Sequence, residues 1–311
     1  MTPDVNTVPP MTGPGQHPIG RRPAPLALLV AMRPHEWIKN LLVFAGLLFS
    51  GSVDDPAAVL DAVVAFAAFC GVSSAGYLFN DLRDVDRDRA HPTKYRRPIA
   101  IGDLSPSLAA VAAVVLAAGA VVLAAAVLPL EVAGYVALYG AITAAYTLIL
   151  KRIVIIDVMT ISSLFILRVV AGAVAVGASA SEYLLVCTAM LALFLGFTKR
   201  RQEATDEKAA VADTRPVLEH YSVPFLDQMV SMVTAAAIIS YIIYAVSSPI
   251  VGSTMLATAP SVLYGIFRYL YLVYDRKDTR STAAILSEDP GMIFAGISWI
   301  AAALAVLYVF N

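Results

Sequence analysis

The sequence predicts an all-α protein of the polytopic membrane class, a bundle of nine transmembrane helices. Two observations lead to this prediction. The chain is 59% hydrophobic, and nine of its segments approach the roughly 20 apolar residues that a membrane-spanning helix needs. In addition, 20 of the 22 Lys and Arg residues lie near the start of the chain or in every second gap between these segments. Positive charge collects on the cytoplasmic side of membrane proteins. We therefore expect one domain over residues 26–311, with the N-terminus inside and the C-terminus outside.

The apolar segments are too long and too uniformly apolar for the strands of a barrel, so each is expected to be a helix. They run near 36–53, 57–80, 105–126, 131–150, 154–176, 182–198, 224–247, 256–274 and 290–310. The basic gaps between them lie near 83–97, 151–152, 199–215 and 276–280. The intervening gaps hold no Lys or Arg, which places the basic gaps together on the cytoplasmic face of an integral inner-membrane protein.

Composition also limits the class of function. The formal net charge is −1, so the overall balance predicts no nucleic-acid partner, whereas the one-sided basic surface suits an anionic substrate or anionic lipid heads. Cys70 and Cys187 fall within apolar segments and are interpreted as small buried hydrophobes. The four histidines lack zinc-ligand spacing. Residues 1–25 are rich in Pro, Gly and Thr, and are predicted to form a disordered tail.

A run of carboxylates follows the second apolar segment. If the helix continues, Asp81, Asp84 and Asp88 lie at i, i+3 and i+7 on one face, with Asn80 on its flank. Carboxylates that share a face repel one another unless a cation lies between them, and Mg²⁺ suits such a site because it also shares substrate phosphate oxygens. The alternative is a solvated helix with Asp–Arg pairs such as Asp84 with Arg87.

The loop that follows brings three cations, Lys94, Arg96 and Arg97, close to these carboxylates. Metal-binding carboxylates beside a cluster of Lys and Arg form a natural site for a magnesium-chelated diphosphate. The alternative is that the loop is basic only because of membrane topology. We expect Asp81, Asp84 and Lys94 to be the catalytic residues.

The run from Asn80 to Gly102 reads N-D-x-x-D-x-x-x-D followed by R-P-I-A-x-G, and it resembles the first signature of the UbiA-type intramembrane transferases. The entry segment 33–40 resembles the start of that family and brings Lys39 near the site. Nine spans agree with the family's fold, and the resemblance implies an active-site mouth that faces the cytoplasm. It also implies a Mg²⁺ cofactor, with Mn²⁺ as a substitute. The implied metal ligands are Asp81, Asp84 and Asp88.

The second motif departs from the family pattern. The family usually carries D-x-x-x-D after its sixth span, but residues 199–207 here read KRRQEATDE. Glu203 is three residues after Arg200, so it either orients that Arg or reaches a metal. Asp206 and Glu207 are also open to a solvated-loop interpretation.

This departure favours one branch of the family. The runs H-P-T-K-x-x-R-P-I-A and K-R-x-x-E resemble the polyprenyl-phosphate phosphoribosyltransferases. The resemblance implies phosphoribosyl pyrophosphate as donor, a polyprenyl phosphate (typically decaprenyl phosphate) as acceptor, and a role in making arabinogalactan precursors for the cell wall. The residues expected to bind these substrates are Lys39, Asn80, Arg97, Lys151, Arg152, Asp157, Lys199, Arg200 and Glu203.

Two charges lie inside the fifth segment. Asp157 and Arg168 are eleven residues apart, about 16 Å along a helix, so they cannot pair directly. Charges within a membrane face a cavity or a partner. We expect Asp157 near the polar head of the substrate. Arg168 either lines the cavity or bonds carbonyls inside the bundle, and Arg268 in the eighth segment has the same two interpretations.

Two other functions remain open from the sequence. The first is a UbiA-type prenyltransferase that moves a prenyl group from a prenyl diphosphate to an aromatic or other small acceptor. The second is a transporter or lipid flippase, but a transporter should carry charges at mid-membrane on several helices, whereas the carboxylates here collect at one surface. The sequence leaves the oligomeric state open, with a homo-oligomer among the options.

Overall fold

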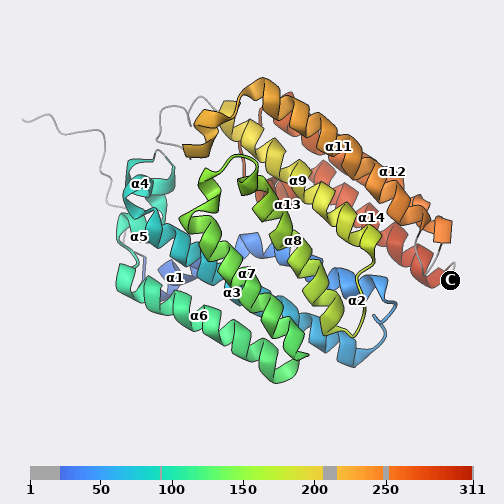
Figure 1. The fold of residues 1–311 in the computed structure, drawn as a ribbon, viewed down its shortest axis with the longest axis horizontal. Helices are drawn as coiled ribbons and strands as arrows, with labels where there is room; N and C mark the ends of the chain where they lie inside the picture. Colours follow the sequence, from blue (N-terminus) through green and yellow to red (C-terminus); the bar gives the residue numbers. More distant parts are fainter. Residues whose placement is uncertain (1–21, 92, 206–215, 248–251, 310–311) are drawn as a thin grey trace, which may run out of the picture.

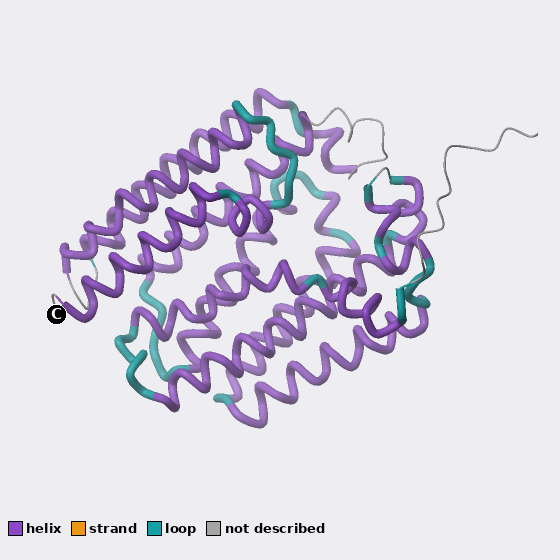
Figure 2. The backbone as a smooth tube through the Cα atoms, turned by 180° about the vertical axis from the view of Figure 1, so that it is seen from behind, coloured by secondary structure: helices purple, strands orange, loops and turns teal. Residues whose placement is uncertain are grey.

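The computed structural model describes residues 22–91, 93–205, 216–247 and 252–309. Within these residues every regular element is a helix and there is no strand (Figure 2). Residues 1–21 of the predicted disordered tail lie outside the described residues, and the first helix begins at Ala24, inside the range predicted for the tail.

The helices agree closely with the predicted segments. The long helices are α3 (Pro56–Arg83), α6 (Pro106–Val127), α7 (Leu130–Leu148), α8 (Ile156–Ala175), α9 (Glu182–Thr205), α11 (Val223–Val246), α12 (Ala259–Tyr274) and α14 (Pro290–Val309). The short α-helices are α1 (Ala24–Met32), α2 (Ala45–Phe49), α4 (Val85–Ala90), α5 (Pro98–Ile101) and α13 (Thr282–Glu288). The 3₁₀ elements are η1 (Pro34–Phe44), η2 (Lys94–Arg96), η3 (Leu150–Arg152), η4 (Pro216–His220) and η5 (Gly252–Thr258).

Fewer than nine helices meet the length and composition of a membrane span. Six described helices are long and apolar enough, or up to seven if α13 and α14, which are bent by 75° to each other, count as one span. The first predicted segment, near 36–53, is not one long helix, because it consists of η1 followed by the short α2. The fourth is the single helix α7, whose apolar character is diluted by Glu131 and several Tyr residues. The count of nine spans stays a prediction.

Local signals fix where several long helices begin. Asp55 accepts a hydrogen bond from the backbone N–H of Ala57 at the start of α3, and Ser105 accepts one from Leu108 at the start of α6. Proline follows each of these capping residues, as it also follows Val223 in α11. Side-chain capping combined with Pro in the first turn is typical of helix N-termini, because it satisfies free N–H groups without losing a needed donor.

The helices form two groups joined through α8 (Figure 1). In the first group α3 packs along α6 and α7. In the second, α9 packs along α11, and α12 along α14. Helix α8 contacts both α7 and α9. This central position agrees with its burial, because 56% of the α8 span is buried inside the protein, against 11% of the α6 span.

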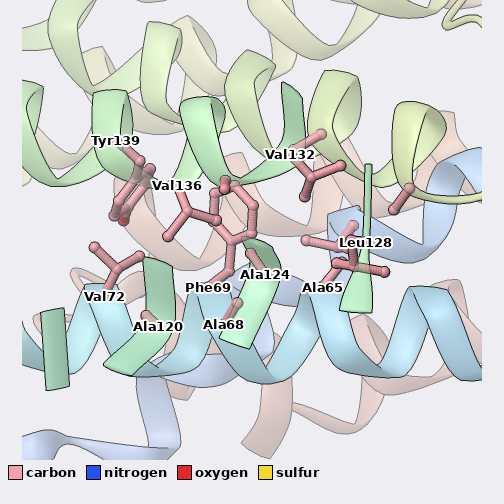
Figure 3. Close-up of a cluster of buried hydrophobic side chains, with 14 of the residues drawn as sticks. Ala65, Ala68, Phe69, Val72, Ala120, Ala124, Leu128, Val132, Val136 and Tyr139 are labelled. Atoms are coloured by element: carbon pink, nitrogen blue, oxygen red, sulfur yellow. The ribbon is translucent and has the colours of Figure 1, made fainter. Parts of the chain in front are cut away.

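The first group is packed around small side chains (Figure 3). Ala68 on α3 and Ala124 on α6 are fully buried, and Phe69 fills the space towards α7. The Phe69 ring meets Tyr139 of α7 edge-on, with ring centroids 5.4 Å apart. Helices in a membrane associate through such close packing, because lipid tails are as apolar as the side chains.

The broken first segment packs against α8 at a glycine. A Cβ on Gly172 would overlap the carbonyl oxygen of Val43, and a Cβ on Gly46 would overlap the backbone of Ala173. Only glycine therefore permits the backbones to approach this closely. The contact holds η1 and α2 against α8, and so positions Arg33, just before η1, and Asn40, within it.

The fold brings basic residues of separate segments together. Helices α4 and α5 lie where α3 ends, and α14 finishes at the other end of the bundle (Figure 1). The loops η3 and η4 contact each other. The basic residues after α3, those after α7 and the triplet 199–201 near the end of α9 thus lie at one end of the protein.

Candidate active site

The predicted carboxylates lie where α3 passes into α4. Helix α3 ends at Arg83, and Asp84 links it to α4 with a backbone outside the helical region (φ −102°, ψ 10°). Backbone hydrogen bonds nevertheless continue, from Asp84 N to Asn80 O at 3.0 Å and from Asp88 N to Asp84 O at 2.8 Å. The helical register is therefore kept through the link, which allows Asp81 and Asp88 to reach a common partner.

That partner is Arg97. Its Nη1 donates to Asp81 Oδ1 at 3.0 Å and to Asp88 Oδ2 at 2.6 Å. Arg33 Nη2 donates to the same Asp81 oxygen at 2.6 Å, and its guanidinium lies 4.9 Å from the ring centroid of Tyr77. Asp81 is only 2% exposed. A buried carboxylate needs paired positive charge, and the two arginines supply it.

Asp84 pairs with a different cation. Lys151 Nζ donates to both carboxylate oxygens of Asp84, at 2.9 and 2.8 Å, and to Asn80 Oδ1 at 3.2 Å. Lys151 belongs to η3, the link between α7 and α8, and Arg152 beside it is exposed. Among the described residues Asp84 is paired with Lys151 rather than with Arg87. Three residues that were each expected at the site, Asn80, Asp84 and Lys151, therefore lie together, although their pairing was not predicted.

Asp88 lies outside the membrane span, in α4. It is 3% exposed, and this burial raises the pKa of its carboxyl, while the charges of Arg97 and Lys94 oppose the rise. The catalytic role expected for Lys94 stays a prediction.

His91 organises the loop that carries Lys94 and Arg97. Its Nδ1 accepts the backbone N–H of Thr93 at 3.2 Å and that of Lys94 at 3.3 Å. A ring nitrogen can accept only when it carries no proton. Burial lowers the pKa of His91, and the charges of Lys94 and Arg97 lower it further. The loop is therefore held by the neutral form of the ring.

A second polar cluster centres on Arg200 of α9. Its Nε donates to Asp157 Oδ2 at 2.6 Å, its Nη1 to Glu203 Oε2 at 2.7 Å and its Nη2 to Tyr146 Oη at 3.2 Å. Asp157 is fully buried and Arg200 is 2% exposed. The expectation that Glu203 orients Arg200 agrees with this geometry. The partnership of Arg200 with Asp157, across 43 residues, was not predicted.

Tyr221 completes this cluster from the loop after η4. Its hydroxyl donates to Asp157 Oδ1 at 2.7 Å and accepts the backbone N–H of Ile155 at 2.7 Å. Both oxygens of Asp157 are therefore engaged, one by a phenol and one by a guanidinium. Asp157 sits at the start of α8, where it also follows the basic residues of η3.

The other cations of the 199–201 triplet have separate partners. Lys199 Nζ donates to Gln202 Oε1 at 2.8 Å and to the backbone oxygen of Arg280 at 3.3 Å. Gln202 also bonds the backbone oxygen of Asp278, so the loop between α12 and α13 is attached to the end of α9. Arg201 Nε donates to Asp227 Oδ1 at 3.0 Å.

Three further predicted residues are placed as follows. Lys39 forms an ion pair with Glu36 within η1. Arg168 is 3% exposed and donates to Asn40 Oδ1, Tyr139 Oη and a backbone carbonyl, so it joins η1, α7 and α8 inside the bundle. This agrees with the interpretation in which Arg168 bonds a carbonyl inside the bundle. Arg268 forms a bidentate pair with Asp289, at 3.0 and 2.9 Å. Asp206 and Glu207 lie outside the described residues.

Sequence reasoning missed four members of these clusters. Arg33 was noted only as the first residue of the entry segment 33–40, and Tyr146, Tyr221 and Gln202 were given no role. Each contacts a candidate residue more than 40 positions away or holds a remote loop. The one local signal is that Arg33 precedes the Pro34 of the entry segment, which forces a turn next to it.

Comparison with known proteins identifies the family. The family model described as the UbiA prenyltransferase family matches residues 40–297, which is most of the chain and includes every member of the two clusters except Arg33. The chain belongs to the UbiA prenyltransferase family. The decaprenyl-phosphate phosphoribosyltransferase of Corynebacterium glutamicum is 36% identical over 222 residues, which cover 70% of this chain and 66% of the relative. The protein of the same name from Mycolicibacterium smegmatis is 38% identical over 224 residues, 71% of this chain and 70% of the relative.

A solved structure shares the UbiA fold. The UbiA homolog from Archaeoglobus fulgidus bound to GPP and Mg²⁺ superimposes with a TM-score of 0.68, at 20% identity, over 90% of this chain and 99% of the homolog. At that identity the likeness concerns the fold alone.

The side chains of this UbiA family member fit a hard divalent cation held by two carboxylates. In the described part of the chain, no group of three or more His, Cys, Asp or Glu side chains is placed to hold a metal ion. Arg97 instead lies between Asp81 and Asp88, so the geometry already accommodates positive charge there. All the donors are oxygens, and Mg²⁺ commonly uses one or two carboxylates together with waters and substrate phosphate oxygens. A three-carboxylate ligand set stays a prediction.

Proposed function

We propose that this UbiA family member transfers a 5-phosphoribosyl group from phosphoribosyl pyrophosphate to a polyprenyl phosphate, with decaprenyl phosphate as the acceptor and Mg²⁺ as the cofactor. The observation that carries the proposal is the identity of 36% and 38% with two relatives named decaprenyl-phosphate phosphoribosyltransferase. The site geometry supports it, because cations from three separate segments, Arg33, Arg97 and Lys151, converge on the carboxylates after α3. A donor that carries a diphosphate and a 5-phosphate, and an acceptor that carries a further phosphate, need several such cations.

The proposed binding roles follow from these contacts. Asp81 and Asp84, with Asp88, would hold Mg²⁺, which would neutralise charge on the leaving diphosphate. Arg97 and Lys151, which lie at these carboxylates, would bind the diphosphate oxygens. Charge-assisted hydrogen bonds from guanidinium and ammonium groups to phosphate are the strong kind.

Several cations remain for the other phosphate groups. Lys94 and the exposed Arg152 are assigned to the 5-phosphate of the donor or to the acceptor phosphate, together with Lys39 and Lys199. Arg200, Asp157 and Glu203 are assigned to the wall of the site. Because Arg200 is 2% exposed and bonded to three side chains, its role is to fix Glu203 and the start of α8 rather than to move onto a ligand.

The proposed reaction exchanges one bond at the anomeric carbon. The bond from this carbon to the pyrophosphate oxygen breaks early, which gives a ribosyl centre with oxocarbenium character, and an oxygen of the acceptor phosphate forms the new bond from the opposite face. Pyrophosphate leaves with the bonding electron pair. The acceptor oxygen is already an anion, so no strong general base is needed. Catalysis then comes mainly from positioning and from fixed positive charge around the leaving group.

The membrane arrangement follows from the same proposal. The charged site faces the cytoplasm, where a soluble sugar phosphate is available, and the polyprenyl chain leaves the bundle sideways into lipid. The exposed apolar side chains of α6, such as Val114 and Val122, suit contact with lipid. Nine crossings, with the C-terminus outside, belong to this proposal.

A radiolabel assay tests the donor. Purified protein in lipid vesicles is given ribose-labelled phosphoribosyl pyrophosphate with and without decaprenyl phosphate, and label is counted in the organic extract. Label is expected in the lipid only when both substrates and Mg²⁺ are present, together with one pyrophosphate for each label transferred. Consumption of a prenyl diphosphate with an aromatic acceptor, without use of phosphoribosyl pyrophosphate at millimolar concentration, would instead establish the prenyltransferase alternative.

A further inference from the structure

The turn between η3 and α8 is strained. Ile155 has a φ of 69° and a ψ of −46°. A positive φ is a genuine outlier for a β-branched side chain, because Cβ then crowds the backbone. Such strain persists only where surrounding contacts fix the backbone. Some contact must therefore hold this turn in place.

The contact that holds it is the hydroxyl of Tyr221. This hydroxyl accepts the N–H of Ile155 at 2.7 Å and donates to Asp157 Oδ1 at 2.7 Å, so it bonds both sides of the strained residue. The remaining oxygen of Asp157 is occupied by Arg200 at 2.6 Å. Arg200 thus ties the Asp157 carboxylate to α9. The Tyr221 hydroxyl donates its proton to the other oxygen of that carboxylate.

Tyr221 itself is firmly placed. It is 6% exposed and packs with the fully buried Val158, Val217 and Leu226. Its ring stacks on Phe225, with centroids 6.0 Å apart. A hydroxyl on a ring held this way has little freedom, so its position is set by the loop after η4 and the start of α11.

The same turn carries a residue of the proposed site. Lys151 lies four residues before Ile155, in η3, and its ammonium reaches Asp84 at 2.8 Å and Asn80 at 3.2 Å. Backbone hydrogen bonds from Ile153 N to Leu150 O and from Asp157 N to Ile153 O connect the two ends of the turn. A shift of the backbone at Ile155 is therefore transmitted to Lys151.

We propose that Tyr221 is a positioning residue, whose hydroxyl holds the strained turn at Ile155 and thereby fixes the ammonium of Lys151 at the carboxylate of Asp84. Its importance for turnover rests on the proposed function, in which Lys151 binds phosphate oxygens. Its action on the turn does not depend on that function.

Hydrogen exchange tests the action on the turn without any substrate. Tyr221→Phe removes one oxygen and keeps the ring. Backbone amides of residues 149–157 are expected to exchange at least about tenfold faster in this variant, because the two hydrogen bonds of the hydroxyl, from Ile155 N–H and to Asp157, are lost from a strained segment. The matched control is Tyr274→Phe, which removes a hydroxyl that bonds the carboxylate of Asp227 at 2.9 Å elsewhere on the same side of the protein. The control should leave 149–157 unchanged.

A double-mutant cycle tests the route through Lys151. Tyr221→Phe should lower kcat/KM about tenfold in the native background, and Lys151→Met should lower it at least as much. In the Lys151→Met background the further effect of Tyr221→Phe should be under about twofold, because coupled residues are not additive. The conservative substitution Lys151→Arg keeps the charge. In that background Tyr221→Phe should still lower kcat/KM.

The outcomes separate the proposals. Unchanged exchange over 149–157, or fully additive kinetic effects of the two substitutions, would overturn the role of Tyr221. The same conclusion holds if Tyr221→Phe gives no folded protein while Tyr274→Phe does, because the hydroxyl would then serve folding as a whole. If exchange over 149–157 is faster in Tyr221→Phe but the wild-type protein never uses phosphoribosyl pyrophosphate, the role of Tyr221 at the turn is supported and only the proposed function is contradicted.

Discussion

The guanidinium of Arg200 lies 2.6 Å from the carboxylate of Asp157, although 43 residues separate them. The two side chains are 2% and 0% exposed. Both were expected from the sequence to contact substrate, yet each is the main partner of the other. Desolvation of two charges is expensive, and their attraction offsets this cost only when the geometry is good and the other polar atoms are bonded. Here Tyr221, Tyr146 and Glu203 provide those bonds.

This pair predicts a large difference between neighbouring arginines. Arg200→Ala should lower the free energy of unfolding by about 3–5 kcal/mol, because it leaves the Asp157 carboxylate buried without a counter-charge. Arg201→Ala should cost about 1 kcal/mol, because its partner Asp227 is 42% exposed and surface pairs contribute little. Denaturant or thermal unfolding in lipid nanodiscs measures both. Equal losses in the two variants would contradict the assignment, and Arg200→Ala/Asp157→Ala should recover part of the loss.

The sequence predicted those parts of the fold that depend on local features, such as the length of an apolar run. Apolar length alone located α3, α6, α8, α9 and α11 to within a few residues, apart from the end of α9. Apolar length was a poor guide near 36–53, because that apolar run does not form one continuous helix. Gly46 and Gly172 let η1 and α2 pack against α8 so closely that this segment is a 3₁₀ element and a short helix rather than one span. No periodicity in the run near 36–53 reports that contact.

For the candidate site, too, local features could be predicted from the sequence and long-range contacts could not. Spacing predicted that Asp81, Asp84 and Asp88 share one face. Asp81 and Asp88 do share Arg97, but Asp84 pairs with Lys151 instead. The partners of the carboxylates could not be predicted, because Arg33 is 48 residues from Asp81 and Lys151 is 67 from Asp84. Ion pairs between separate helices depend on how the bundle packs, which a single sequence does not state.

The loop after α4 predicts a dependence on pH. Burial and neighbouring cations lower the pKa of His91 below its ordinary 6.5. The folded protein therefore binds fewer protons at this ring than the unfolded chain does, so its contribution to stability is full above pH 6.5 and is lost as pH falls through the lowered pKa. We expect the amides of Thr93 and Lys94 to exchange faster at pH 5 than at pH 7.5, after correction for intrinsic rates.

The control for this pH effect is His91→Asn. Its side-chain oxygen keeps an acceptor near these amides but does not titrate in this range, so the difference in exchange between the two pH values should disappear. A His91 pKa above 6.5, measured by NMR of labelled histidine, would contradict the prediction.

The one-sided basic loops predict the topology. A fluorescent or enzymatic reporter fused after Asn311 should read as extracytoplasmic, and one inserted in the 206–215 segment should read as cytoplasmic. Reporter activity in intact cells, compared with protease access in inverted vesicles, measures both. A cytoplasmic C-terminus would mean that an even number of segments crosses the membrane, and the broken η1–α2 segment would be the first to be reassigned.

The carboxylates after α3 give the most direct test of the site. Asp81→Asn and Asp84→Asn should each lower kcat/KM at least about 100-fold, because each removes a charge that is meant to hold the cation at the leaving group. The matched control is Asp86→Asn in the same stretch. Its side chain is 90% exposed and pairs only with the exposed Arg89, so activity should change by less than about twofold.

Metal dependence is measured on the unmodified protein, so that loss of folding in a variant does not decide the result. Excess EDTA should abolish label transfer to lipid, and Mg²⁺ or Mn²⁺ in excess over the chelator should restore it. Monodisperse elution and an unchanged melting temperature are required of Asp81→Asn and Asp84→Asn before their rates are compared. Turnover that persists in excess EDTA, or that is normal in both variants, would show that Arg33, Arg97 and Lys151 provide all the positive charge that the reaction uses.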